Sequence, residues 1–247
     1  MPNKQISSKP ASDLRAIKIY LGGSFDPVHK SHLALLAHVY SKLATYSEKV
    51  EGYFLPTSRS PLKSESSEAE HRLNMLAEAI KDMRNTELPT PFKSNFGDTI
   101  GISDHEIWQS PPTYTINTLT ELRSQYPNYS LVFIVGADNI ANLSKWRDGD
   151  KLTQFAHLWV FPRDTMQSQT EILALLPESL KSQVTFNVQD LKINTHGHIY
   201  IDSQTVAPLS STQIRQAIKE GKPNIAKSAL PHSVYSYIMK NNLYHSY

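Results

Sequence analysis

Cysteine is absent from this chain of 247 residues. Its absence excludes disulfides, catalytic thiolates and thiolate metal ligands, and it is typical of proteins in a reducing compartment, so we expect a cytoplasmic protein. The chain also lacks any run of about 18 apolar residues, so we predict no membrane-spanning segment and no membrane partner. Residues 1–15 are polar and do not contain the apolar core of a secretory signal peptide.

The chain has little excess charge of either sign. It carries 25 basic and 23 acidic residues, a net charge of +2 with histidine neutral. Nucleic-acid-binding domains usually present a strongly basic face, so we predict no nucleic-acid partner. The hydrophobic content of 39% suffices for one sizeable α/β core. We expect residues 1–14 to form a flexible tail and residues 15–247 to form a single domain, and the sequence leaves open whether it assembles as a homo-oligomer.

Short apolar segments alternate with amphipathic helical patterns along the chain. Residues 131–135 form a continuous apolar run, which is typical of a strand buried on both faces of a parallel sheet. The alternation predicts an α/β fold, a doubly wound (Rossmann-like) parallel sheet with helices on both faces and a helical C-terminal part after about residue 209. The predicted strands are 17–21, 50–55, 99–103, 131–135, 158–161 and 198–201, and the predicted helices are 31–45, one containing 73–80, and 114–123.

The most specific string in the sequence is G-G-S-F-D-P-V-H-K-S-H, residues 22–32. It follows a predicted strand and opens a predicted helix, a layout that suits phosphate because glycines permit close backbone approach and helix-terminal N–H groups bind anions. His29 and His32 are three residues apart and can therefore face the same anion. The string is neither a dinucleotide fingerprint nor a P-loop. A zinc site is disfavoured, since H-E-x-x-H needs a spacing of four.

A second candidate anion site is L-S-S-T-Q-I-R, residues 209–215. One interpretation is a capping box, with Ser210 as N-cap and Gln213 reaching back to its N–H. The other is a polyphosphate site, because hydroxyl groups donate hydrogen bonds and the guanidinium of Arg215 binds two phosphate oxygens in a fixed fork. The candidate phosphate site at residues 22–32 favours the polyphosphate interpretation.

With these motifs, the chain resembles the bacterial nicotinate/nicotinamide mononucleotide adenylyltransferases, within the nucleotidyltransferases that carry an H-x-G-H-like motif. The resemblance covers about residues 17–244. Its signatures are G-G-S-F-D-P-V-H-K-S-H, P-P-T-Y-T-I-N-T-L, G-A-D followed by Trp146, and S-S-T-Q-I-R. It implies that the enzyme transfers the adenylyl group of ATP to nicotinate mononucleotide, releasing pyrophosphate. Nicotinamide mononucleotide as the main acceptor stays open.

The resemblance also implies roles for individual residues. His29, His32 and Arg215 would be catalytic, and the acceptor phosphate is already ionised, so positioning and charge stabilisation would supply the rate. Mg²⁺ would be carried mainly by the ATP phosphates, so no protein ligand is predicted. The acceptor mononucleotide would be bound by Lys63, Tyr114, Thr115 and Trp146. ATP would be bound by Gly22, Gly23, Ser24, Phe25, Asp138, Arg163, Ser211 and Thr212, with Asp138 alternatively the N-cap of the following helix.

Several positions depart from the family pattern. Ser31 stands where glycine is usual, which adds a side chain near the phosphates, and Leu62 replaces a usual histidine before Lys63. Gln213 replaces the commoner aspartate. After the strand at 158–161, the usual R-P-G is replaced by P-R-D-T, in which Arg163 is the candidate for ATP contact.

Three other functions are alternatives to adenylyl transfer to a pyridine mononucleotide. Pantetheine-phosphate adenylyltransferases share the first motif in a T-x-G-H form, and His29 counts against them. An inactive nucleotide-sensing module is favoured only by Ser31 and Leu62. An amino-acid-activating fragment would need a tRNA-binding extension or basic surface, for which the sequence gives no support. The segment 167–192 has no assigned role, although 170–180 is compatible with a helix.

Overall fold

The computed structural model describes residues 15–58, 67–85, 96–162, 168–204 and 209–245. Within these ranges, seven strands form one sheet in the order β3-β2-β1-β4-β5-β7-β6, and every pairing is parallel. The order runs outward in both directions from β1 and β4, which defines a doubly wound fold and confirms the predicted class. The strands are β1 Ile17–Gly23, β2 Val50–Pro56, β3 Ile100–Ile102, β4 Ser130–Gly136, β5 His157–Phe161, β6 Val184–Thr185 and β7 Ile199–Ile201.

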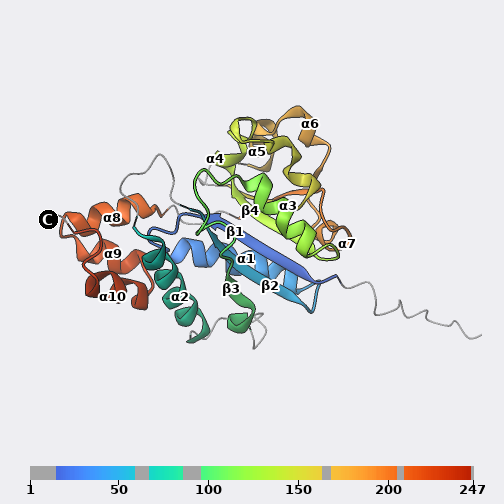
Figure 1. The fold of residues 1–247 in the computed structure, drawn as a ribbon. Coiled ribbons are helices and arrows are strands. Elements are labelled where there is room, and N and C mark those ends of the chain that lie inside the picture. The colour runs from blue at the N-terminus through green and yellow to red at the C-terminus, as the bar shows by residue number, and fades with distance from the viewer. Residues whose placement is uncertain (1–14, 59–66, 86–95, 163–167, 205–208, 246–247) are drawn as a thin grey trace, which may run out of the picture.

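Helices cover both faces of the sheet (Figure 1). The α-helices are α1 Lys30–Ala44, α2 Ala69–Asn85, α3 Thr115–Gln125, α4 Ala137–Ile140, α5 Gln169–Leu175, α6 Glu178–Lys181, α7 Asp190–Ile193, α8 Ser211–Lys219, α9 Pro223–Ala229 and α10 His232–Lys240, and 3₁₀ turns are η2 Phe96–Thr99, η3 Leu143–Lys145 and η4 Gly149–Gln154. The last three helices form the predicted helical C-terminal part. In the described part of the chain, none of the helices is long and apolar enough to cross a bilayer.

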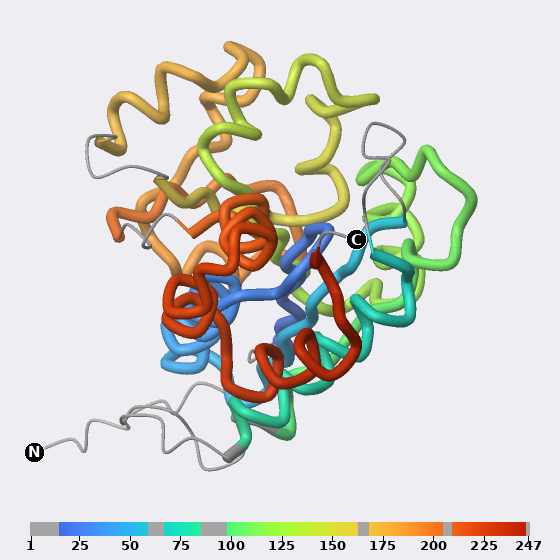
Figure 2. Tube along the Cα trace, turned by 90° about the vertical axis from the view of Figure 1, so that its left-hand side faces the viewer, coloured from blue at the N-terminus to red at the C-terminus, as the bar shows by residue number. Residues whose placement is uncertain are grey.

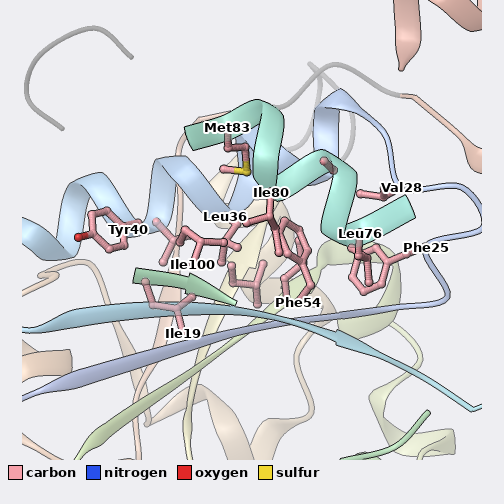
Figure 3. Packing of buried hydrophobic residues seen from close by; sticks show 14 of the residues in the cluster. Ile19, Phe25, Val28, Leu36, Tyr40, Phe54, Leu76, Ile80, Met83 and Ile100 are labelled. Atoms are coloured by element: carbon pink, nitrogen blue, oxygen red, sulfur yellow. The ribbon is translucent and has the colours of Figure 1, made fainter. Parts of the chain in front are cut away.

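Side chains of the central strands alternate between two cores. In β1, Ile19 and Leu21 face the core shared with α1, α2 and the C-terminal helices, whereas Tyr20 faces the core shared with α3, α4 and α5. In β4, Ile134 and Phe133 divide in the same way. Figure 3 shows the first of these cores, packed between the sheet and helices α1 and α2. Because both faces are buried, β4 is apolar at five consecutive positions, which is why its sequence predicts it so clearly.

A buried carboxylate fastens α1 to the sheet. Asp202 follows β7 and is fully buried, and its two oxygens bind His38 Nε2 at 2.8 Å and Lys42 Nζ at 3.0 Å, both on α1. The indole N–H of Trp159 also donates to it at 3.0 Å. Burial alone would raise the pKa of Asp202, but the hydrogen bonds from His38, the Gln204 N–H and Lys42 lower it to about 2. These bonds join the second half of α1 to the carboxyl end of β7.

The structure differs from the predicted elements mainly between β5 and β7. This stretch contains the two-residue strand β6, which no periodicity could reveal, at the edge of the sheet beside β7. The helix considered over 170–180 is divided into α5 and α6, because Pro177 lacks the N–H that a continuous helix needs. The remaining predicted strands, and the helices predicted at 31–45 and 114–123, are present within two residues of their predicted bounds, and the helix predicted to contain 73–80 is α2.

Candidate functional site

A cavity of about 320 Å³ lies where the strand order reverses, at the carboxyl ends of β1 and β4. In doubly wound sheets this crevice is where ligands bind. Its lining comes from the strand ends, the first two turns of α1, α4 and the start of α8. The lining includes Gly22, His29, Ser31, His32, Gly136, Asn139, Ser210 and Gln213.

Two histidine rings stack at the start of α1. His29 is the N-cap, in extended conformation, and His32 is the third helical residue; their ring centroids are 3.7 Å apart. The backbone N–H of His29 donates to Nδ1 of His32 at 3.2 Å. A nitrogen that accepts a hydrogen bond carries no proton, so the neutral His32 ring keeps its proton on Nε2. The predicted shared face is confirmed, and His32 Nε2–H is a hydrogen-bond donor.

The loop between β1 and α1 packs against this pair of histidines. Phe25 has a φ of +49°, in the left-handed region that a non-glycine residue adopts at a cost of order 1–3 kcal/mol. Its ring is 1% exposed and packs edge-on against His32, with centroids 5.0 Å apart. At Gly23, a Cβ would lie 3.1 Å from the Phe25 ring, so glycine leaves the room that this packing needs. The side chain of Phe25 thus orients His32, and its ring also packs edge-on against Phe54 of β2, with centroids 5.5 Å apart.

The residues of α8 contact the same loop. Ser211 Oγ donates to the carbonyl of Pro27 at 3.0 Å, and Arg215 Nη1 donates to the carbonyl of Asp26 at 2.7 Å. Arg215 Nη2 also donates to Thr212 Oγ1 at 3.3 Å. These bonds place a guanidinium and two hydroxyl groups against the loop that precedes the histidine pair, which brings the two predicted anion sites together.

The start of α8 corrects one expectation. Ser210 is the N-cap, as predicted, but its side chain makes no capping hydrogen bond, so the predicted capping box is wrong. Ser210 and Gln213 instead line the cavity. The N-terminus of α8 therefore joins that of α1 at one cavity, and helix N-termini carry N–H groups and partial positive charge that favour anions.

The predicted acceptor-binding residues lie on neighbouring elements. Tyr114 is the N-cap of α3 and Thr115 its first residue, while Trp146 is the C-cap that follows η3. The guanidinium carbon of Arg147 lies 4.8 Å from the centre of the Tyr114 ring, which joins the two segments. Tyr114 and Trp146 both pack on the core beneath α3. The three predicted residues are not among those that line the 320 Å³ cavity.

Of the other predicted binding residues Asp138, Lys63 and Arg163, the structure describes Asp138. Asp138 is exposed in the first turn of α4, directly after β4, but Gly136 is the N-cap, so the alternative role of Asp138 as N-cap is wrong. Lys63 and Arg163 lie outside the described residues, as does the Leu62 departure. The departure at Ser31 is described, and its side chain is buried and lines the cavity. Among the described residues, no group of three His, Asp or Glu side chains is placed to hold a metal ion.

Sequence reasoning missed Arg72, Asp26 and Tyr244. Arg72 of α2 is 2% exposed and donates to the carbonyls of Ser24 and Thr57 at 2.9 and 2.8 Å. A lone arginine in an amphipathic helix is usually solvated, so nothing local indicates this role. Asp26 belongs to the first motif, which was the available signal, yet its partners lie far along the chain.

A larger cavity, of about 940 Å³, lies between α1, α2, α9 and α10. Its lining includes Leu33, Met83, Leu230 and Tyr235, and no described residue that the sequence singles out as catalytic or binding lines it. Size alone therefore does not identify the site; the convergence of glycine, histidine and helix N-termini does.

These features define a nucleotidyltransferase-type site on a doubly wound sheet, and comparison with known proteins agrees. Residues 20–217 match the cytidylyltransferase-like family model, so the chain belongs to that family. Its relatives include the probable nicotinate-nucleotide adenylyltransferase of Coxiella burnetii (strain Dugway 5J108-111), which is 31% identical over 224 residues, 90% of this chain and 95% of the relative. The protein of the same description from Legionella pneumophila (strain Paris) is 30% identical over 233 residues, 94% and 100%. The predicted resemblance is confirmed.

Solved structures show the same fold. The nicotinic acid mononucleotide adenylyltransferase of Plasmodium falciparum, complexed with NaAD, aligns with a TM-score of 0.69 at 22% identity, covering 93% of this chain and 97% of that one. A putative nicotinate-nucleotide adenylyltransferase from Vibrio parahaemolyticus aligns with a TM-score of 0.55 at 16% identity, covering 94% and 97%. At these identities the likeness concerns the fold.

Proposed function

We propose that this protein transfers the adenylyl group of ATP to nicotinate mononucleotide, forming the deamido dinucleotide of NAD biosynthesis and releasing pyrophosphate. The observation that carries the proposal is the cavity at the β1–β4 switch point, where the N-termini of α1 and α8 meet beside the stacked pair His29 and His32. Such a site suits polyphosphate chemistry. The relatives described as probable nicotinate-nucleotide adenylyltransferases, aligned over nearly their whole length, supply the reaction.

In this reaction, an oxygen of the mononucleotide phosphate attacks the α-phosphorus of ATP. A bond forms between that oxygen and the α-phosphorus. The bond between the α-phosphorus and the oxygen that bridges it to the β-phosphorus breaks, so pyrophosphate leaves with that electron pair. The attacking phosphate is ionised near neutral pH, and the protein needs no strong base. Its contribution is in-line positioning and donors that stabilise charge as it develops.

The hydrogen-bond donors of the histidine pair contact the phosphates of ATP. His32 contributes Nε2–H to the reacting phosphoryl group, and His29 lies against it in the same stack. Gly22 and Gly23, with the backbone of Ser24 and Phe25, allow the phosphates to approach β1 closely.

The other ATP contacts come from α8 and the strand ends. Arg215, with Ser211 and Thr212, holds the leaving pyrophosphate; the guanidinium has five N–H donors, and its bonds to Asp26 and Thr212 use two of them. Asp138, exposed beyond β4, meets the ribose hydroxyls, and Arg163 contacts ATP.

On the acceptor side, Tyr114, Thr115 and Trp146 contact the pyridine ring, with Trp146 stacking on it. Lys63 meets the acceptor phosphate. Mg²⁺ would be held mainly by the ATP phosphates, which supply hard oxygen ligands of the kind it prefers, and it would neutralise part of their charge.

The test is Mg²⁺-dependent pyrophosphate release from ATP with nicotinate mononucleotide, nicotinamide mononucleotide and phosphopantetheine offered separately. We expect the largest kcat/KM with nicotinate mononucleotide. A larger value with the nicotinamide compound would overturn the proposed acceptor. Pyrophosphate release with phosphopantetheine alone would show that the protein is a pantetheine-phosphate adenylyltransferase. A folded protein that binds ATP and reacts with none of the three would be a nucleotide sensor.

A further inference from the structure

A buried carboxylate in the loop between β1 and α1 binds the far end of the chain. Asp26 is 3% exposed, and its Oδ1 accepts the hydroxyl of Tyr244 at 2.6 Å, across 218 residues of sequence. Its Oδ2 accepts the backbone N–H of Ser67 at 3.1 Å. Hydrogen bonds to an ionised group are shorter and about twice as strong as neutral ones. Figure 2 shows the red C-terminal end beside the blue strands, where this contact is made.

Two arginine side chains, from helices α2 and α8, donate hydrogen bonds to carbonyl groups of the same loop. Arg72 of α2 donates to the carbonyl of Ser24, and Arg215 of α8 donates to that of Asp26. Asp26 is therefore the one residue of the loop whose backbone contacts a proposed catalytic group while its side chain contacts the C-terminal segment. Movement of Asp26 would displace Arg215 and, three peptide units further on, the ring of His29.

The Tyr244 hydroxyl is well placed to be a permanent donor. Burial raises its pKa, and the negative charge of Asp26 raises it further, so the hydroxyl stays protonated at neutral pH. Tyr244 has a φ of +66°, a left-handed conformation that is costly for a tyrosine and persists where surrounding contacts over-determine it. Its side chain packs on the core beneath α1 and α2.

We propose that Tyr244 is a positioning residue for adenylyl transfer: its bond to Asp26 holds the loop 24–27 in the one geometry in which the histidine pair and Arg215 act on the same ATP molecule. Tyr244 does not line the cavity and is assigned no contact with substrate. The inference rests on the proposed function, because the step that it serves is the one described above. Preorganisation of this kind appears in kcat, since it lowers the barrier without adding ground-state contacts.

The experiment compares Tyr244→Phe with a matched control. Tyr237→Phe removes the hydroxyl of another C-terminal tyrosine, which bonds His71 Nδ1 and Asn74 Nδ2 of α2, each at 3.0 Å, and does not touch the loop. We expect Tyr244→Phe to lower kcat roughly tenfold or more, as misplaced catalytic groups do. The KM for nicotinate mononucleotide should stay unchanged. Tyr237→Phe should lower the melting temperature comparably and keep kcat within about twofold.

Asp26→Asn and the double variant complete a cycle. If one hydrogen bond carries the effect, the double variant should lose no more kcat than the more impaired single variant. Equal loss of kcat in Tyr237→Phe, or additive losses in the double variant, would overturn the proposal, as would kcat within twofold of wild type in Tyr244→Phe. Should Tyr244→Phe fail to fold, Asp26→Asn, which retains the tyrosine ring, decides by the same kcat criterion.

A second measurement separates this inference from the proposed function. Amide hydrogen exchange of residues 22–26 should be faster in Tyr244→Phe than in wild type, with Tyr237→Phe at the wild-type rate. This readout needs no turnover. Wild-type protein that is inactive with pyridine mononucleotides but shows this exchange pattern would refute the function and retain the loop contact. Active wild-type protein with unchanged exchange and kcat in Tyr244→Phe would refute the positioning role alone.

Discussion

Burial distinguishes the two histidines at the start of α1. His29 is 3% exposed, whereas His32 is half-buried and presents Nε2–H while its Nδ1 is held by the backbone. A donor fixed before the substrate arrives stabilises developing phosphoryl charge without reorganisation.

We therefore expect His32→Ala to lower kcat roughly 10²–10³-fold, the effect of losing one preorganised donor. Steady-state rates would measure it, with circular dichroism confirming the fold. His71→Ala is the control, because this histidine bonds Tyr237 and is not among the residues that line the cavity. Near-full turnover in a folded His32→Ala enzyme would contradict the role.

Arg215 carries a prediction about binding rather than turnover. Its guanidinium is fixed by the carbonyl of Asp26 and by Thr212 in the first turn of α8. Arg215→Ala should weaken ATP binding by about ten- to a hundredfold, since hydrogen bonds to charged groups contribute about 1.5–3 kcal/mol. Arg215→Lys should be intermediate, because an ammonium group keeps the charge and loses the fork. Calorimetry that shows unchanged ATP affinity in both variants would leave this segment as a structural helix start.

Local signals account for the predicted residues that line the cavity. Gly22, His29 and His32 are close together in the sequence, at a strand–turn–helix junction whose geometry is short-range, and all three line the cavity. Arg72 and Tyr244 could not be predicted, because their partners lie 48 and 218 residues away and only the folded sheet brings them to the loop.

At the scale of elements, the turn from η3 to η4 presents Trp146. Gly149 packs so closely that a Cβ would lie 2.1 Å from the carbonyl oxygen of Leu143 and 3.1 Å from the Cβ of Trp146. Because backbone cannot yield as a flexible side chain does, Gly149→Ala should displace this turn. We expect a higher KM for nicotinate mononucleotide and an unchanged KM for ATP, measured by varying each substrate separately. An equal rise in both values would show a general loss of folding rather than a local shift.

Elements with a strong local sequence pattern could be predicted, and elements without one could not. β4 was predicted from five consecutive apolar residues, and the start of α8 from its serine N-cap. β6 has two residues and exists because β7 offers a partner edge, which is a tertiary cause. The absent capping hydrogen bond at Ser210 has a similar origin, since the helix start faces a cavity and the neighbouring Ser211 bonds the loop at Pro27.

At the scale of the whole molecule, the doubly wound class by itself locates the site. Once alternating strands and helices indicate a parallel sheet, ligands are expected at the strand carboxyl ends, and the two motifs after β1 and before α8 meet there. The acceptor side was less accessible to prediction, because Tyr114 and Trp146 come from separate turns, one before α3 and one after η3.

Stability of the molecule should fall in mild acid because of a buried histidine at the opposite end of the sheet. His157, the first residue of β5, is fully buried; its Nε2–H donates to the carbonyl of Asn194 at 3.0 Å and its Nδ1 accepts the N–H of His198 at 3.1 Å. Both bonds suit the neutral ring, and protonation at Nδ1 would break the second. Burial lowers the pKa of His157 to about 3.

An unfolded histidine has a pKa of about 6.5, so the unfolded state binds a proton first as the pH falls. A folded pKa below the unfolded one contributes stability that is full above pH 6.5 and is lost toward pH 3. Wild-type unfolding free energy should therefore fall by about 2–3 kcal/mol between pH 6.5 and pH 4.5 from this residue. Asp202, with its pKa near 2, adds its own loss only below about pH 4. Urea unfolding across pH 7 to 4.5 would show a smaller slope in His157→Gln, and equal slopes in the two proteins would contradict the assignment.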